Sequence, residues 1–401
     1  MKIFLLDIAE TRLQLLPLTY TRCIGELRVG ILKIQEKWSI TLDSEVSIIT
    51  ETYLGKEKPK SNGATQLIIN ASLCPNPLLT KALEVLKENQ KLVQGNTFLA
   101  AKITSMAAFD IKLRENLTSI EYPGKIDLIE RPWDIFVKNG DQIRLDFDLL
   151  TKDRKSKTLT DPHTRVYNEK NIFLEEGAEV TAAILNAKNG PIYIGKNAKI
   201  HEGAIIKGPF ALCENGQVNM GAKIRGDSTF GPYTKVGGEV TNSVIMGYSN
   251  KGHEGYLGNS VIGEWCNLGA DTNTSNMKNN YSQIKMWDYT KDSFVKTGLQ
   301  FCGLIMGDHS KCGINTMFNT GTVVGVSTNI FGSGYPRNVI PSFSWGGVNG
   351  FSTHALNKAK ETATIAMRRK TKEWSKLDDD IFEEVFDRSA RYRVWENNDK
   401  L

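Results

Sequence analysis

The 401-residue chain lacks the hallmarks of membrane and secreted proteins. It has no run of about eighteen apolar residues, which excludes a typical transmembrane helix. Its first segment, residues 1–7, turns acidic too soon for a secretory signal peptide. With 40% hydrophobic and 24% charged residues, the composition is that of a globular protein in water. We therefore expect a cytoplasmic protein with no membrane partner.

The chain also has few cysteines and only a small excess of positive charge. The formal net charge is only +5. The densest basic cluster, at 368–372, is followed at once by the acidic run 378–380, which is typical of a solvated helix face, so no nucleic-acid partner is expected. No C-x-x-C spacing occurs, which favours reduced structural thiols over disulfides or a zinc site at Cys23, Cys74, Cys213, Cys266, Cys302 and Cys312.

The strongest pattern present is an apolar residue at every sixth position of residues 194–236, with small or turn residues between. A period of six suits neither a strand nor a helix, whose side-chain periods are two and 3.6. It is typical of a parallel β-solenoid built from hexapeptides, in which each short strand points one side chain inwards. The predicted inward positions are Ile194, Ile200, Ile206, Leu212, Val218, Ile224, Phe230 and Val236.

The six-residue register then breaks and later returns. Residues 242–303 interrupt it, although Ile262 and Leu268 keep the spacing briefly, and a polar run at 271–283 departs from it. Long excursions from a regular scaffold commonly carry function. Further coils are expected where the spacing returns, at Met306, Cys312, Phe318, Val324 and Ile330.

The first part of the chain predicts an α/β sheet domain. Residues 2–6 and 67–70 have the pattern of buried strands, and residues 26–38 and 75–86 have helical patterns. This alternation predicts ligand loops at strand ends. A polar linker at 152–163 ends the domain.

At the other end of the chain, two apolar stripes at helical spacing, around 356–367 and 381–386, predict helices that cap or flank the solenoid end.

The segment 7–22 resembles the opening of the sugar-1-phosphate nucleotidyltransferases. A strand is followed by a loop ending in Thr11-Arg12, then by Pro17-Leu-Thr and a basic residue, Arg22. The resemblance implies that Arg12 neutralises phosphate charge and that Arg22 stands where a lysine holds the sugar phosphate. The loop has no glycine, so its backbone approaches phosphate less closely than the family's Gly-rich loop. The family's magnesium-binding Asp would fall at residues 70–72, where no carboxylate occurs.

A second resemblance covers nearly the whole chain. The domain order, and the phrase Pro132-Trp-Asp-Ile-Phe136, are similar to the bifunctional GlmU-type enzymes that make UDP-N-acetylglucosamine. This resemblance implies an α/β nucleotidyltransferase-like domain at 1–165, a left-handed parallel β-helix acetyltransferase domain at 166–350 and a helical tail at 351–401. The left hand breaks the usual crossover rule and comes from the resemblance alone. A homotrimer with the acetyl site between subunits is also implied.

The stretch 251–258, Lys-Gly-His-Glu-Gly-Tyr-Leu-Gly, resembles the acetyltransferase motif of that family, with Asn-Leu-Gly-Ala following at 267–270. By this match His253 is the general base and Tyr256 contacts the sugar phosphate. Asn267 and Asn276 orient the amino sugar. Acetyl-CoA is expected along the later coils, near Gly313 and Asn315. The family's phosphate-binding Arg aligns with Gly237 and a family Tyr with Met277, so other cations are candidates for the phosphate: Lys235, Lys251, Lys278 and Lys285.

The predicted chemistry needs such residues. An amine must lose a proton as it attacks a thioester carbonyl, and imidazole has an unperturbed pKa near neutral. Asn can hold the amine by hydrogen bonds without charging it. The alternative for His253 is an ordinary surface-turn histidine, and structural roles are expected for His163, His201 and His309.

Four hypotheses follow. The first is N-acetylation of glucosamine-1-phosphate by acetyl-CoA, coupled to uridylyl transfer from UTP assisted by Mg²⁺. Its metal ligands stay open among Asp7, Asp141, Asp146 and Asp148. The second keeps only the acetyltransferase and treats the N-terminal domain as a binding module. The third is a non-catalytic trimeric scaffold, and the fourth is an acyltransferase for a different sugar nucleotide.

Overall fold

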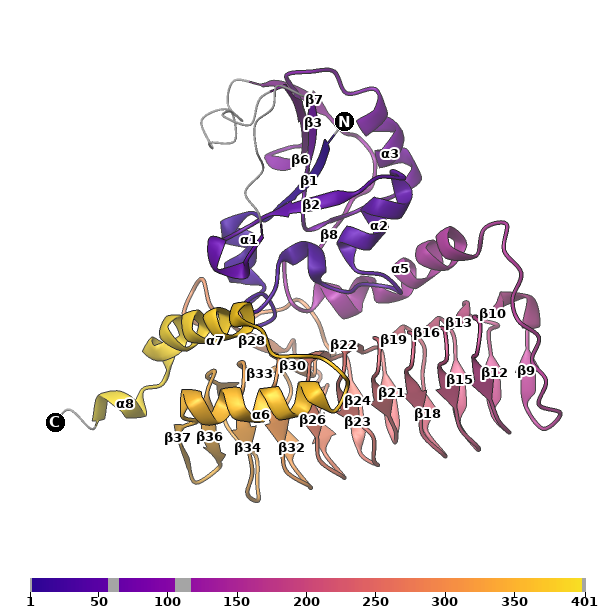
Figure 1. Ribbon diagram of the computed structural model, residues 1–401. Helices are drawn as coiled ribbons and strands as arrows, with labels where there is room; N and C mark the ends of the chain where they lie inside the picture. The colour runs from indigo at the N-terminus through magenta and orange to yellow at the C-terminus, as the bar shows by residue number, and fades with distance from the viewer. Residues whose placement is uncertain (1, 57–64, 105–116, 399–401) are drawn as a thin grey trace.

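The computed structural model describes residues 2–56, 65–104 and 117–398. An α/β domain at the N-terminus sits above the middle of a long parallel β-solenoid, and the C-terminal helices pack beside both (Figure 1). The predicted combination of an α/β domain, a parallel solenoid and C-terminal helices is confirmed. Within the described ranges no helix is both long and apolar enough to cross a membrane.

The N-terminal domain is built on a six-stranded mixed sheet in the order β2-β1-β3-β6-β5-β7. The strands β1, β2 and β3 are parallel, so their carboxyl ends meet at one edge, whereas β6 runs antiparallel to β3. The predicted strands at 2–6 and 67–70 are confirmed. The strands are β1 (Lys2–Leu6), β2 (Val46–Ile49), β3 (Gln66–Asn70), β5 (Gln90–Gln94), β6 (Thr97–Ile103) and β7 (Thr118–Glu121), with a separate pair formed by β4 (Leu73–Cys74) and β8 (Asp127–Leu128).

The helices of this domain correct one prediction. The helix expected at 26–38 begins only at Ile34, because residues 27–33 form a tight reversal in which Arg28 bridges Lys33. Gly30 at φ +81° allows this turn, and a Cβ there would lie 2.5 Å from Asp146 Oδ2. The helices are α1 (Ala9–Gln14), η1 (Ile24–Glu26), α2 (Ile34–Thr41), η2 (Thr52–Leu54), α3 (Pro77–Glu84) and α5 (Asp134–Thr151).

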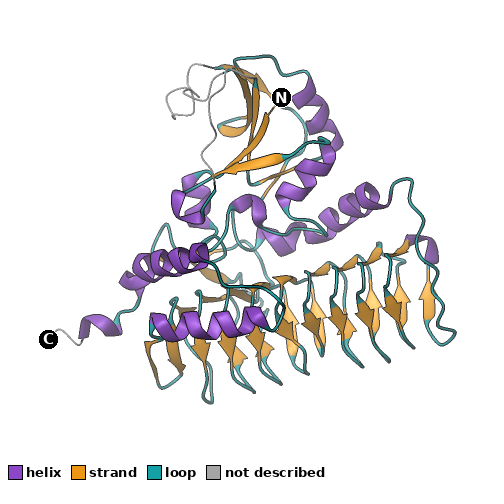
Figure 2. Ribbon diagram, in the orientation of Figure 1, coloured by secondary structure: helices purple, strands orange, loops and turns teal. Residues whose placement is uncertain are grey.

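The solenoid strands stack as successive rungs in three long sheets (Figure 2). The nine-stranded sheet contains β10 (Ile172–Leu174), β13 (Ile192–Ile194), β16 (Phe210–Leu212), β19 (Ser228–Phe230), β22 (Val244–Gly247), β25 (Val261–Glu264), β30 (Leu304–Met306), β33 (Thr322–Val324) and β35 (Val339–Ile340). The ten-stranded sheet contains β11 (Glu179–Val180), β14 (Lys199–Ile200), β17 (Gln217–Val218), β20 (Lys235–Val236), β23 (Asn250–Lys251), β26 (Asn267–Leu268), β31 (Lys311–Cys312), β34 (Asn329–Ile330), β36 (Ser344–Gly347) and β37 (Gly350–Thr353).

The third sheet has six strands and is continued by a separate pair. It contains β9 (Arg165–Tyr167), which the short helix η4 (Glu169–Asn171) follows, and β12 (Ile184–Asn186), β15 (Ile205–Lys207), β18 (Lys223–Ile224), β21 (Glu239–Thr241) and β24 (Tyr256–Gly258). The pair is formed by β27 (Asn273–Thr274) and β32 (Met317–Phe318).

All the predicted inward residues of both six-residue blocks are buried in one continuous cluster, so the predicted register is confirmed. The interruption is shorter than expected, however. After Val236 the coils continue, but some turns are shorter: Val240, Ile245 and Ile262 each follow the preceding inward residue after four or five positions instead of six. The chain leaves the solenoid only after β27, for a hairpin made of β28 (Lys285–Asp288) and β29 (Ser293–Lys296).

Most of the C-terminal helical segment lies along the side of the solenoid, and its last helix contacts β37, the terminal strand of the ten-stranded sheet (Figure 1). The C-terminal helices are α6 (Leu356–Arg368), α7 (Lys376–Ser389), η5 (Ala390–Tyr392) and α8 (Trp395–Asn398). The predicted apolar face of α6 is confirmed by the burial of Ala359, Ala363 and Met367. Helix α7 is capped by Ser375, and it packs against the N-terminal domain through η2. All six cysteines are buried and free, as predicted.

Candidate functional site

His253 lies on the turn at 252–255, which joins β23 to β24. The turn is fixed from two sides. Asn219 donates from Nδ2 to the carbonyl oxygen of Gly252 at 2.7 Å. Gly255 has φ +112°, and a Cβ there would lie 2.2 Å from the carbonyl oxygen of Thr272, so only glycine fits. The imidazole itself is exposed and accepts or donates no hydrogen bond within the described part of the chain, so it is free to face a ligand.

Lys251 is placed differently from its predicted role in binding the sugar phosphate. It occupies an inward solenoid position, in register with Val236, and its side chain is buried. Its Nζ donates to the carbonyl oxygens of His253 at 2.5 Å and Glu254 at 2.9 Å. This geometry opposes phosphate binding by Lys251 and makes it the internal support of the turn that carries His253.

Lys251 also gives the protein a predictable dependence on pH. Burial lowers the pKa of Lys251 to about 8 from the ordinary 10.5. Because the folded state binds the proton more weakly than the unfolded state, stability should rise as pH increases from about 8 towards 10.5. We expect the Lys251→Met variant to lack this rise, in urea unfolding measured at several pH values. Parallel pH profiles for the two proteins would contradict the prediction.

His253 and Asn267 line one groove of about 1000 Å³ between the ten-stranded sheet and α6. Both side chains are exposed. Asn267 accepts a hydrogen bond through Oδ1 from Asn250 Nδ2 at 3.4 Å. The two side chains predicted to act as the base and to orient the amine therefore line the same groove.

Tyr256 and Asn276 form a second group, outside the lining of this groove. Asn276 donates from Nδ2 to the Tyr256 hydroxyl at 3.0 Å and to Asn259 Oδ1 at 2.8 Å. Gly258 makes the contact possible, since a Cβ there would lie 2.4 Å from the Tyr256 hydroxyl. A single chain thus divides the predicted acetyl-transfer residues into two groups.

Gly313 and Asn315 lie on the turn one coil beyond Asn267. The coils approach closely here, because a Cβ on Gly269 would lie 2.5 Å from the Gly313 carbonyl carbon. Asn315 is exposed at φ +57° and donates its backbone N–H to the Ala270 oxygen at 2.8 Å. Ile314, which lies between Gly313 and Asn315, lines the same groove as His253. The predicted acetyl-CoA position is therefore next to the groove that contains His253.

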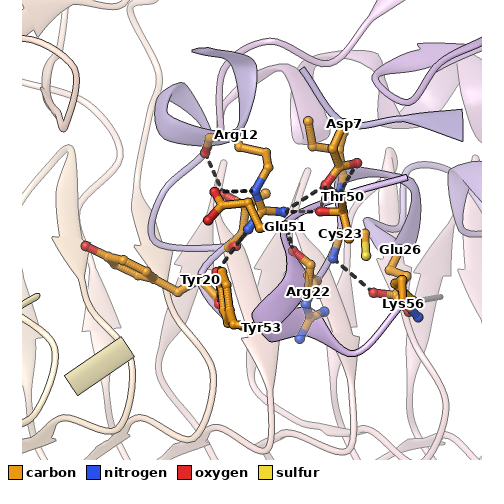
Figure 3. A network of polar contacts seen from close by, with 12 residues as sticks. Asp7, Arg12, Tyr20, Arg22, Cys23, Glu26, Thr50, Glu51, Tyr53 and Lys56 are labelled. Atoms are coloured by element: carbon orange, nitrogen blue, oxygen red, sulfur yellow. Dashed lines mark hydrogen bonds and ion pairs between the residues drawn. The ribbon is translucent and has the colours of Figure 1, made fainter. Parts of the chain in front are cut away.

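In the N-terminal domain, Arg12 is held in a buried network rather than exposed in a loop (Figure 3). It lies on α1 and pairs through Nη1 with Asp7 Oδ2 at 2.8 Å. Its Nη2 donates to the Thr19 carbonyl at 2.6 Å and to the Tyr53 hydroxyl at 3.0 Å. Burial raises the pKa of Asp7, which the Arg12 charge opposes. The predicted loop is therefore a short helix, and the Arg12 charge is already matched.

Arg22 reaches out of its own domain to the solenoid. It forms a buried ion pair with Asp308 and lies 3.6 Å from Glu264. Burial by itself would lower the pKa of Arg22, but the negative charges of Asp308 and Glu264 have a larger combined effect, so the pKa of Arg22 is raised. Both predicted phosphate-binding arginines thus face carboxylates in the folded chain.

The four aspartates left open as magnesium ligands do not form one shared site in the described chain. The Asp7 carboxylate is taken up by Arg12, and buried Asp146 by Lys37 and two backbone N–H groups. Asp141 and Asp148 are exposed on α5. At the end of β3, Asn70 accepts hydrogen bonds from Ser72 and presents no carboxylate. Mg²⁺ prefers free carboxylate oxygens, and no group of three or more acidic, histidine or cysteine side chains that could hold a metal ion occurs among the described residues.

Sequence reasoning missed the contribution of the C-terminal helix to the groove. Arg369 and Lys370, just after α6, line it together with Lys311 from β31 and Trp265 from the solenoid turn. The basic cluster at 368–372 was the available signal, but its position beside His253 depends on how α6 folds back along the coils. His309 is buried between Trp265 and Phe382, which fits its predicted structural role.

Comparison with known proteins supports the resemblances drawn from the motifs. Residues 3–155 match the family model described as sugar nucleotidyl transferase. The chain is 30% identical over 294 residues to the "Bifunctional protein GlmU" of Methanocaldococcus jannaschii, which spans 71% of this chain and 60% of that protein. The chain therefore covers less than two thirds of this relative.

Two further relatives match shorter stretches. A "Bifunctional sugar-1-phosphate nucleotidylyltransferase/acetyltransferase" of Sulfurisphaera tokodaii is 35% identical over 144 residues, 35% of each chain. The "Putative uncharacterized acetyltransferase YaiX" of Escherichia coli strain K12 is 29% identical over 164 residues, 40% of this chain and 68% of that protein. The suspected similarity to proteins named GlmU is thereby confirmed.

Proposed function

We propose that this relative of the GlmU-named proteins transfers an acetyl group from acetyl-CoA to the amine of glucosamine-1-phosphate at the solenoid. The observation that carries the proposal is that His253 and Asn267, both exposed, line the same groove. The turn that carries His253 is fixed by Lys251 and Gly255. The named acetyltransferase activities of the relatives support the same reaction class.

In the proposed reaction the amine nitrogen attacks the thioester carbonyl carbon. A C–N bond forms, the C–S bond breaks, and CoA leaves as the thiol after taking up a proton. His253 accepts the proton that the amine loses, and the Asn267 amide holds the amine without charging it. We further propose a homotrimer in which a neighbouring subunit brings the Tyr256–Asn276 pair to the groove, since one chain alone leaves that pair outside it.

The test is release of the CoA thiol from acetyl-CoA in the presence of glucosamine-1-phosphate. Thiol release that requires the amino sugar would support the proposal. A trimeric protein that releases no thiol with this acceptor would refute it. Activity with other amino sugars would then favour the different-substrate hypothesis, and inactivity with all of them the scaffold.

Uridylyl transfer from UTP to N-acetylglucosamine-1-phosphate is the second candidate, favoured by the family match over residues 3–155. We place it second because Arg12 and Arg22 are paired with carboxylates and because residues 70–72, at the end of β3, include no carboxylate. Release of pyrophosphate that depends on Mg²⁺ would establish this activity. Its absence from a protein that acetylates would leave the domain as a binding module.

A further inference from the structure

The groove beside His253 carries a one-sided charge. Among its described lining residues four are cations and none is a carboxylate. Two cations come from the solenoid, Lys235 on β20 and Lys311 on β31, and two come from the chain just after α6, Arg369 and Lys370. A concave surface with charge of one sign attracts a ligand of the opposite sign.

None of these four cations forms an ion pair with a described residue. Lys311 is engaged, since its Nζ donates to the His309 carbonyl oxygen at 3.0 Å, which leaves Lys235, Arg369 and Lys370 for a ligand. Their neighbour Arg368 differs, since its Nε lies 3.7 Å from Glu373. Burial lowers the pKa of Lys370, and the positive charges of Lys235 and Arg369 add to this effect. The two halves of the groove therefore repel each other unless an anion lies between them.

A ladder of aromatic rings positions the α6 side of the groove. Tyr233 stacks on Tyr248 at 5.2 Å and Tyr248 on Trp265 at 4.2 Å, on three successive solenoid turns. The Nζ of Lys370 lies 6.0 Å from the Tyr233 ring, and that of Lys372 lies 6.0 Å from the Tyr248 ring. Such cation–π contacts attach the chain after α6 to the solenoid, so its cations are pre-positioned.

The solenoid itself has no room for an arginine where the resemblance placed one. Gly237 lies against the turn of His253, and a Cβ there would be 2.5 Å from the Gly252 carbonyl oxygen. A side chain at 237 would disturb the turn that carries the base. A phosphate ligand near this turn must therefore be held by residues from elsewhere in the chain.

We infer that Lys235, Arg369 and Lys370 bind the phosphate group of the acceptor, so that the C-terminal helix α6 completes the acetyl-transfer site. The inference rests on the proposed function and narrows its substrate class to a phosphorylated amino sugar. Arg369 offers a planar guanidinium that can bind two phosphate oxygens at once, and the lysines act as point charges. The basic cluster at 368–372, expected to be a solvated helix face, is thus divided between the groove and solvent.

The test uses two variants, Arg369→Gln with Lys370→Gln, and Lys235→Gln from the opposite wall. Each removes charge-assisted hydrogen bonds to phosphate, so KM for glucosamine-1-phosphate should rise at least about tenfold. KM for acetyl-CoA and the kcat should change far less. The matched control is Arg368→Gln, which alters an exposed neighbour outside the groove and should leave both KM values unchanged.

The phosphate groups of CoA are the other anions that these three cations could bind. If the variants raised KM for acetyl-CoA but not for glucosamine-1-phosphate, the groove would belong to the donor and the assignment would be overturned. Equal KM values in all proteins would overturn it as well. Calorimetric titration with glucosamine-1-phosphate separates this inference from the proposed reaction: binding lost in the variants would uphold the phosphate site even if the unaltered protein released no thiol.

Discussion

Replacing His253 by alanine is expected to slow thiol release from acetyl-CoA at least about a hundredfold, the usual loss when a general base is removed. The imidazole is exposed, and the turn is fixed by backbone and Lys251 contacts that the substitution leaves in place. The loss should therefore fall on kcat, with little change in thermal stability. Steady-state kinetics with a thiol reagent, and thermal unfolding of the same samples, measure both quantities.

The matched control is His201→Ala. His201 follows β14, on the turn that corresponds to 252–255 three coils earlier, and does not line the groove. Its replacement should leave thiol release unchanged. If both variants retained full activity, His253 would be an ordinary turn residue and the base would have to be sought elsewhere.

Replacing Arg22 by methionine should lower the free energy of unfolding by about 3–5 kcal/mol, the range found when one partner of a buried ion pair is removed. The side chains of Arg22 and Asp308 are 8% and 5% exposed, so Asp308 would be left charged and largely cut off from water. Because this pair joins the N-terminal domain to the solenoid, the unfolding transition should also broaden as the two parts separate. Urea unfolding followed by circular dichroism measures both effects.

An exposed ion pair provides the comparison. Arg225 lies 3.0 Å from Glu239, with side chains 67% and 33% exposed, so Arg225→Met should cost at most about 1 kcal/mol. The double variant Arg22→Met with Asp308→Leu should recover part of the loss, since the buried Asp308 charge is removed and only the partly exposed Glu264 loses its cation. Equal effects of Arg22→Met and Arg225→Met would show that the buried pair is not formed in solution.

The sequence could predict the solenoid because its inward residues recur at a fixed spacing, and each must be apolar to fill the narrow interior. The predicted set from Ile194 to Val236 is buried as expected. Where turns shorten, the spacing changes although the coil continues, so counting by six ended the first block too early. Lys251 was considered a candidate phosphate ligand for the same reason, because counting by six did not show that the shifted register places it at an inward position.

The prediction of a helix at 26–38 was wrong for a different reason. Its apolar residues are buried as predicted, but they are buried by a chain reversal that Gly30 permits and that Asn139 and Asp146 of α5 stabilise. These partners lie more than a hundred residues away. Local spacing carries no information about them.

The sequence by itself determined the repeat, the order of the parts and the motif around His253, because these depend on neighbouring residues and on the shape of one coil. Only the tertiary structure decided which charges are free. Arg12 and Arg22, singled out as phosphate ligands, are matched by Asp7 and Asp308, whereas Arg369 and Lys370 stand unmatched beside the proposed base. Charge pairing depends on distance in space, and distant segments are brought together only by folding.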